Sequence, residues 1–208
     1  MSAGSTGYTI LKPPEWERIS LAGDVRRQVR AHVDRAAATH APPSLSPDEL
    51  SPIKARMAHA METRLRHAAE AGGVDYYFPA RPMHGVSINA SFLVSTVMPV
   101  PSAEPGLAPA VLADLVAGGA TRVQVAGTTW ARTERVVATT DGELVAEGVP
   151  GRQVDYTAPT PWDERLWVLV SFTTVGDGDP DSEFTGLVVE MFDALMTTWR
   201  WTHEDATA

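Results

Sequence analysis

The sequence predicts an α+β fold, in which an antiparallel sheet of about six or seven strands carries packed helices. In several segments, apolar residues recur every three or four positions, which is the spacing of a helix. In most others they alternate with polar residues, which is the spacing of a strand. Successive predicted strands are joined by few residues, whereas parallel strands need a crossover connection, usually a helix. A chain of 208 residues, 44% hydrophobic and 21% charged, is typical of one globular core.

The chain divides into three predicted segments: a flexible leader at residues 1–14, a single α+β domain at 15–203 and a polar tail at 204–208. The leader is rich in small and polar residues and ends in two prolines, which is typical of a loop. We therefore expect all packed structure to lie between residues 15 and 203.

Two helices follow the first predicted strand. The first begins after Asp24, whose side chain is suited to capping a helix N-terminus. The second and longer helix begins after Ser46, with Pro47 at its first position and Glu49 placed to complete a capping box. A glycine pair at residues 72–73 ends it. We expect its buried stripe to comprise Leu50, Ile53, Met57, Met61, Leu65 and Ala68.

After the long helix, the apolar spacing changes from that of a helix to that of a strand. A short helix is expected around residues 107–116 and a closing helix at about 182–199. We place strands at residues 16–21, 74–78, 86–98, 121–128, 130–140, 152–158 and 165–175.

The closing helix brings acids and aromatic residues close together in the sequence. Leu187, Phe192 and Trp199 belong to one apolar stripe, which we expect to dock on the core. Glu190 and Asp193 recur on the opposite side. The two carboxylates are therefore predicted to face solvent and not to form an acid site.

Charge and composition exclude several classes of function. The chain has 17 basic and 26 acidic residues, a net charge of -9, which argues against nucleic acids and anionic membranes as partners. It has no cysteine, so disulfides and thiolate chemistry are excluded. No segment is typical of a signal peptide or a membrane span, and we expect a cytoplasmic protein.

No metal, cofactor or catalytic group is predicted. His59 and His67 lie on the long helix about 12 Å apart, too far to share one ion. The acidic segment that begins at Asp177 resembles a calcium loop, but Ser182 replaces its required glycine and Val188 its final glutamate. We expect this segment to be a turn before the closing helix.

Several predicted strands keep a polar side, which a sheet covered on both faces would not show. We predict a partner-binding surface there, around Arg132, Glu134, Asp155 and Trp167, because Trp and Arg are enriched where proteins bind each other. The alternative is a solvated face whose charges pair among themselves.

Four segments resemble a family of uncharacterised actinobacterial proteins that are often encoded near type VII secretion loci: Trp16–Leu21, Ala71–Pro79, Val168–Thr174 and Phe192–Trp201. The order of strands and helices is also similar to the PsbP-like and LpqN-like α/β/α sandwich. Members of that fold mostly bind other proteins, so the resemblance implies a protein partner and a link to secretion. It supplies no catalytic residues.

The sequence thus predicts a non-enzymatic, cytosolic protein-binding or accessory protein whose partner is another protein. The alternative is a small-molecule-binding protein or enzyme with a pocket between the sheet and the long helix. A deep cavity with convergent polar groups would favour the alternative, and a filled core with an exposed Trp/Arg patch would favour the first function.

Overall fold

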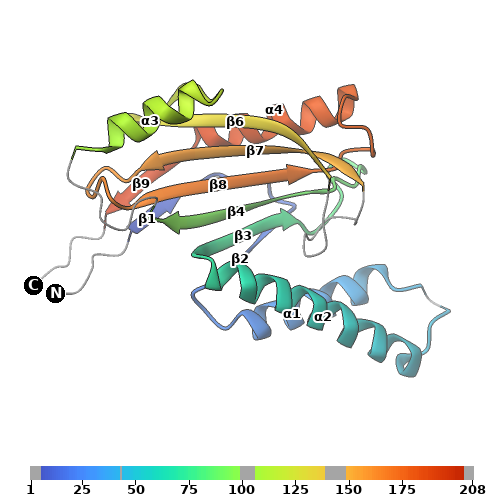
Figure 1. Cartoon of the computed structure of the whole chain (residues 1–208). Coiled ribbons are helices and arrows are strands. Elements are labelled where there is room, and N and C mark those ends of the chain that lie inside the picture. Colours follow the sequence, from blue (N-terminus) through green and yellow to red (C-terminus); the bar gives the residue numbers. More distant parts are fainter. Residues whose placement is uncertain (1–5, 43, 99–105, 139–148, 204–208) are drawn as a thin grey trace, which may run out of the picture.

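The structure, a computed structural model, describes residues 6–42, 44–98, 106–138 and 149–203 (Figure 1). It has the predicted α+β fold, with one seven-stranded antiparallel sheet and a second sheet of two strands. The strand order of the large sheet is β2-β3-β4-β8-β7-β6-β5. These strands are β2 (Trp16–Ser20), β3 (Gly73–Pro79), β4 (Ala90–Val97), β5 (Thr121–Val125), β6 (Thr128–Ala138), β7 (Pro150–Pro159) and β8 (Trp167–Thr174).

The two helices before β3 form a helical hairpin, α1 (Val25–His40) and α2 (Pro47–Glu70). Their predicted caps are confirmed. The Asp24 side chain accepts a hydrogen bond from the Arg27 amide at 2.9 Å. Ser46 and Glu49 form the reciprocal capping box, in which the Ser46 amide donates to the Glu49 carboxylate at 2.9 Å.

Helix α4 (Glu183–Thr197) covers one face of the large sheet, and lies behind it in Figure 1. Phe192 is fully buried and stacks on Phe172 of β8 with ring centroids 4.5 Å apart. Trp199, just beyond the helix, is also fully buried. The docking of the predicted aromatic stripe is confirmed for these two residues, whereas Leu187 is 55% exposed.

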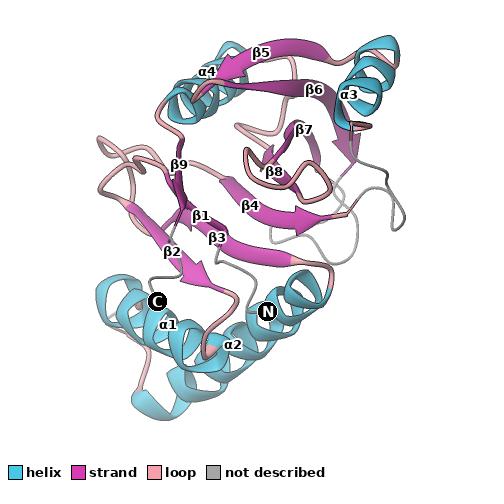
Figure 2. Cartoon of the chain, turned by 90° about the vertical axis from the view of Figure 1, so that its left-hand side faces the viewer, coloured by secondary structure: helices cyan, strands magenta, loops and turns pink. Residues whose placement is uncertain are grey.

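The described helices cover the opposite face only at its ends. The α1–α2 hairpin packs on β2 and β3, where Val29 and Leu65 are buried with Tyr76. Helix α3 (Ala108–Ala117) packs over Ala131 and Trp167 near the other end. Figure 2 shows these two helical units at opposite ends of the sheet, and no described helix covers its middle.

The small sheet joins β1 (Thr6–Thr9) to β9 (Arg200–His203). Strand β1 lies inside residues 1–14, the predicted flexible leader. It is held by long-range contacts: Tyr8 stacks on Trp199 at 4.2 Å, and its hydroxyl donates to Asp75 at 2.6 Å. The predicted tail at 204–208 lies outside the described residues.

Two sequence expectations differ from the structure in local detail. The strand predicted from residue 86 begins at Ala90, because Met83 and Val86 instead bridge a tight turn in which His84 and Gly85 have positive φ angles of 49° and 82°. Met57, expected in the buried stripe of the long helix, is 55% exposed.

None of the described helices combines the length and apolar character needed to cross a membrane.

Candidate functional site

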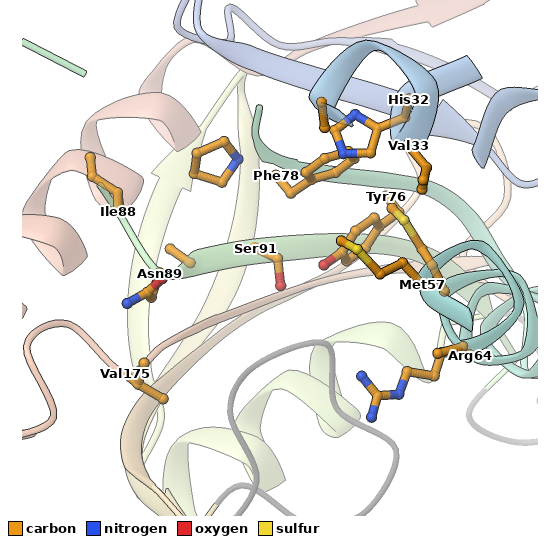
Figure 3. Close-up of a pocket in the computed structure, with 15 residues that line it drawn as sticks. His32, Val33, Met57, Arg64, Tyr76, Phe78, Ile88, Asn89, Ser91 and Val175 are labelled. Carbon is orange, nitrogen blue, oxygen red and sulfur yellow. The ribbon is translucent and has the colours of Figure 1, made fainter. Parts of the chain in front are cut away.

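A cavity of about 430 Å³ lies between the α1–α2 hairpin and strands β3 and β4, partly open to solvent (Figure 3). Its volume falls within the range usual for small-molecule sites. Three groups of side chains line it. Helix α1 contributes His32, Val33 and Ala36; helix α2 contributes Met57, Ala60, Met61 and Arg64; the sheet and its loops contribute Tyr76, Phe78, Pro79, Ile88, Asn89, Ala90, Ser91 and Val175.

The cavity follows from the size of the side chains that face each other across it. Met57, Met61 and Arg64 recur at four and three along α2, so they share one side of the helix. Across from them, β4 presents Ser91, and α1 presents Ala36. These side chains are small, so they leave space beside the methionines. Leu65, one residue beyond Arg64, is instead fully packed in the core.

The sheet wall of the cavity carries two hydroxyls. Tyr76 and Ser91 both line this wall, and the Ser91 side chain acts to lower the Tyr76 pKa. Burial raises the pKa of Tyr76, against the opposing effects of Ser91 and the nearby Arg64 charge. The tyrosine is therefore a neutral hydroxyl at physiological pH, and both groups can donate to a ligand.

The helix wall carries two nitrogen-containing side chains, His32 and Arg64, which differ in their hydrogen-bond partners. The His32 Nδ1 lies 2.9 Å from the Glu17 carboxylate, which Arg35 also contacts at 2.8 Å, and its ring meets the Phe78 ring edge-on. Burial raises the Glu17 pKa, but hydrogen bonds from His32 and Arg35 outweigh it, so the pKa is lowered. Arg64, in contrast, points to the cavity and pairs with no carboxylate of the described chain (Figure 3).

The four predicted partner-binding residues do not share a face. Arg132 and Glu134 point toward α4. Arg132 pairs with Tyr156 in the register of β6 and β7, and the Tyr156 hydroxyl contacts Asp193 of α4. Asp155 and Trp167 point to the opposite face. The two pairs are separated because neighbouring positions along a strand alternate between faces.

Arg132 and Glu134 belong to an ion-pair network at the edge of the α4 face. Arg132 binds Asp193 through two nitrogens, at 3.0 and 2.8 Å, and Glu134 at 2.8 Å. Tyr156 donates to Asp193 at 2.9 Å, and Arg152 pairs with Glu134. Asp193, expected to face solvent, is therefore engaged with the sheet, because the polar edge of α4 meets polar positions on β6.

Asp155 and Trp167 lie on the same face but in different surroundings. Trp167 is only 2% exposed, and its indole donates to the Glu164 carbonyl at 2.9 Å beneath α3. Asp155 is mostly buried in the middle of the sheet, which no described helix covers, and Ser171 and Gln153 donate to it at 2.5 and 2.9 Å. Ser171 and Gln153 lie on the predicted polar side together with Asp155.

A buried carboxylate that the sequence did not single out lies on the α4 face. Asp75 is 0% exposed and accepts hydrogen bonds from Arg18 at 2.7 Å and Tyr8 at 2.6 Å. Burial and the neighbouring Tyr77 and Asp75 raise the pKa of Tyr8. The only sequence signal is an acid within an apolar strand. Its partners satisfy the carboxylate, so the cluster anchors β1.

The acidic segment before α4 is a turn, as predicted. Asp177 accepts hydrogen bonds from the Ser182 hydroxyl at 2.7 Å and the Asp179 amide at 3.3 Å, and the Ser182 hydrogen bond contributes most to lowering the Asp177 pKa. Within the ranges that the structure describes, no three His, Asp or Glu side chains are grouped to hold a metal ion.

Comparison with protein-family models gives no match for this sequence, and comparison with curated proteins gives none. The geometry of the cavity is therefore the basis from which a function is inferred.

Proposed function

We propose that the protein is a cytoplasmic, non-enzymatic binder of a small, largely apolar molecule, which occupies the cavity between the α1–α2 hairpin and the sheet. The cavity itself is the observation that carries this proposal. Its walls are mostly apolar and it holds a small number of polar groups, the arrangement typical of a ligand site.

Flexible sulfur side chains support a binding role. Met57 and Met61 line the cavity, and Met57 is largely exposed although it is apolar. Methionine adapts its shape to irregular surfaces and is common at binding sites that accept varied ligands. A bound molecule would remove this apolar area from water, which is favourable.

Binding fits the polar groups better than a reaction does. Ser91 is the serine of the cavity wall and so a possible nucleophile, but its neighbour on that wall is Tyr76, a neutral phenol and a weak base. His32, the one imidazole of the wall, is hydrogen-bonded to Glu17. The two residues have separate partners, so the arrangement favours holding a ligand.

The proposal is tested with a neutral fluorophore such as N-phenylnaphthylamine, whose emission rises in apolar surroundings. Ala36→Phe places a ring in the cavity and should weaken dye binding by about tenfold or more, equivalent to about 1.4 kcal/mol. Ala38→Phe, at an exposed position on the same helix, is the matched control and should bind like the wild type. Equal dye affinity in all three proteins would exclude the cavity as the binding site.

A second candidate is protein binding by an accessory protein, for which the resemblance to secretion-associated proteins gives the class of partner. The observation that favours it is the middle of the sheet, which no described helix covers and where exposed Arg135 lies 3.6 Å from Asp155. If this strip binds a protein, Arg135→Ala and Asp155→Ala should each abolish capture of the same partner from cells, while Arg122→Ala, exposed on β5, should leave capture unchanged.

A further inference from the structure

Arg64 is the cationic side chain of the cavity wall whose charge is not balanced within the described protein. Two other basic residues of the hairpin have carboxylate partners, since Arg35 contacts Glu17 and Lys54 contacts Asp34. Arg66 has none among the described residues, but it is exposed and does not line the cavity. The neighbours of Arg64 three and four residues away on α2 are Ala60, Met61, His67 and Ala68. None of these is an acid, so the helix itself supplies no ion pair.

The surroundings of Arg64 make an unbalanced charge unfavourable. The side chain is partly buried beside Met57 and Met61, which offer it no hydrogen-bond acceptor of any strength. Moving a charge away from water without a partner costs free energy, and an anion that arrives with a ligand recovers part of that cost.

The other polar groups near Arg64 also favour an anion. The Tyr76 and Ser91 hydroxyls face the same space, and both can donate hydrogen bonds (Figure 3). The guanidinium offers a planar pair of N–H donors, which matches the two oxygens of a carboxylate. Glu17, which contacts the wall residue His32, is already paired with it and with Arg35.

The number of cations limits the charge of the ligand. Arg64 is a single positive charge, so it balances one negative charge, as in a carboxylate, and not the two of a phosphate monoester. In Figure 3, Arg64 lies at one end of the cavity and Ile88 at the other, with Phe78 between them on the sheet side. An apolar body would extend from Arg64 toward Ile88.

We infer that the ligand is a monocarboxylate with an apolar body, whose carboxylate pairs with Arg64 while its body lies against Met57, Met61 and Phe78. This inference depends on the proposed function, because it assigns the chemical class of the molecule that the cavity binds. It also gives a role to the Arg64 charge, which has no carboxylate partner among the described residues.

The experiment compares decanoate with decanol, which share an apolar chain and differ in the head group. Each is titrated against bound N-phenylnaphthylamine at neutral pH, in the wild type, Arg64→Met and Arg66→Met. Arg66 is the matched control, because it lies on the same helix but is exposed and hydrogen-bonds Thr63. Thermal melts establish that the variants are folded.

We expect the wild type and Arg66→Met to bind decanoate about tenfold more tightly than decanol, or better, as a charge-assisted hydrogen bond predicts. Arg64→Met should bind the two compounds equally, with decanol affinity unchanged. If the wild type binds both equally, the inference is wrong and the proposed function stands. If neither compound nor the dye binds, both are wrong. Dye binding without displacement by decanoate also overturns the inference.

Discussion

The two faces of the large sheet have been filled in different ways. On the α4 face, β4 presents Phe92 and Val94, which are buried against a continuous aromatic core. On the other face, the same strand presents Ser91 to the cavity, while Leu93 packs against the hairpin core. Alternation along one strand therefore places the Phe92 ring in the closed core and the small hydroxyl of Ser91 where the cavity opens.

Under the proposed function, the α4 face supplies stability and the hairpin face binds the ligand. The α4 face holds most of the largest fully buried side chains, which supply much of the hydrophobic stabilisation. The hairpin face is less completely filled and keeps apolar side chains such as Met57 in contact with water. We expect substitutions on the α4 face to change stability and those at the cavity to change ligand affinity.

The largest effect should come from Phe192→Ala on the α4 face. Loss of a fully buried ring that stacks on Phe172 should lower the free energy of unfolding by about 3–5 kcal/mol. Urea denaturation measures this change. Leu187→Ala, at an exposed position on the same helix, should change the value by less than about 0.5 kcal/mol. Comparable losses from both would contradict the docking of α4 described above.

A smaller effect is expected at the polar edge of the same face. Asp193→Ala removes the bidentate partner of Arg132 and the acceptor of the Tyr156 hydroxyl, and should cost about 1–3 kcal/mol. Glu190→Ala, exposed on α4, is the control and should be nearly neutral. In a double-mutant cycle, Asp193→Ala should cost little in an Arg132→Met background if the Arg132–Asp193 ion pair is the source of the lost stability.

The pH dependence of stability sharpens the comparison, because tyrosines lie on both faces. Burial is the main factor that raises the pKa values of Tyr8, Tyr76, Tyr77 and Tyr156. Above about pH 10 the unfolded chain releases phenolic protons that the folded chain keeps, so stability is lost as pH rises. Each such proton contributes about 1.4 kcal/mol per pH unit. Tyr76→Phe should make the loss less steep; an unchanged slope would mean that Tyr76 ionises freely.

The smallest change in stability should come from the cavity wall. Met57→Gln replaces a largely exposed apolar side chain with a polar one of similar length, and should shift the free energy of unfolding by less than about 0.5 kcal/mol. The same substitution should weaken dye binding, because it reduces the apolar area of the wall. A variant that melts early and binds dye normally would reverse the assignment of the two faces.

Local signals in the sequence predicted local structure well. The caps at Asp24 and Ser46 depend on residues within one helical turn, and both form as expected. Strands β1 and β9 were not predicted, because they are short and are held by contacts such as Tyr8 with Asp75, which are 67 residues apart in the chain. Such contacts leave no periodic pattern in the sequence.

The candidate site was predicted only as a location. The sequence allowed for a pocket between the sheet and the long helix, but assigned Met57 and Met61 to the core, because an apolar stripe looks the same whether it meets a filled core or a cavity. Arg132 and Asp155 were predicted to share a face, but the register of β6 against β7 places them on opposite faces. This register depends on pairing between strands, which the pattern of a single strand does not encode.

The pairing of β1 with β9 also affects the order in which the protein folds during synthesis. Thr6 pairs with His203, so the first described strand has no partner until the last one has been translated. Until then, Asp75 lacks the Tyr8 hydroxyl and Trp199 lacks its stacked ring. The large sheet can assemble earlier from strands that are neighbours in sequence, such as β5, β6, β7 and β8. We therefore expect closure of the small sheet to follow assembly of the large one, because β1 cannot pair until β9 has been translated.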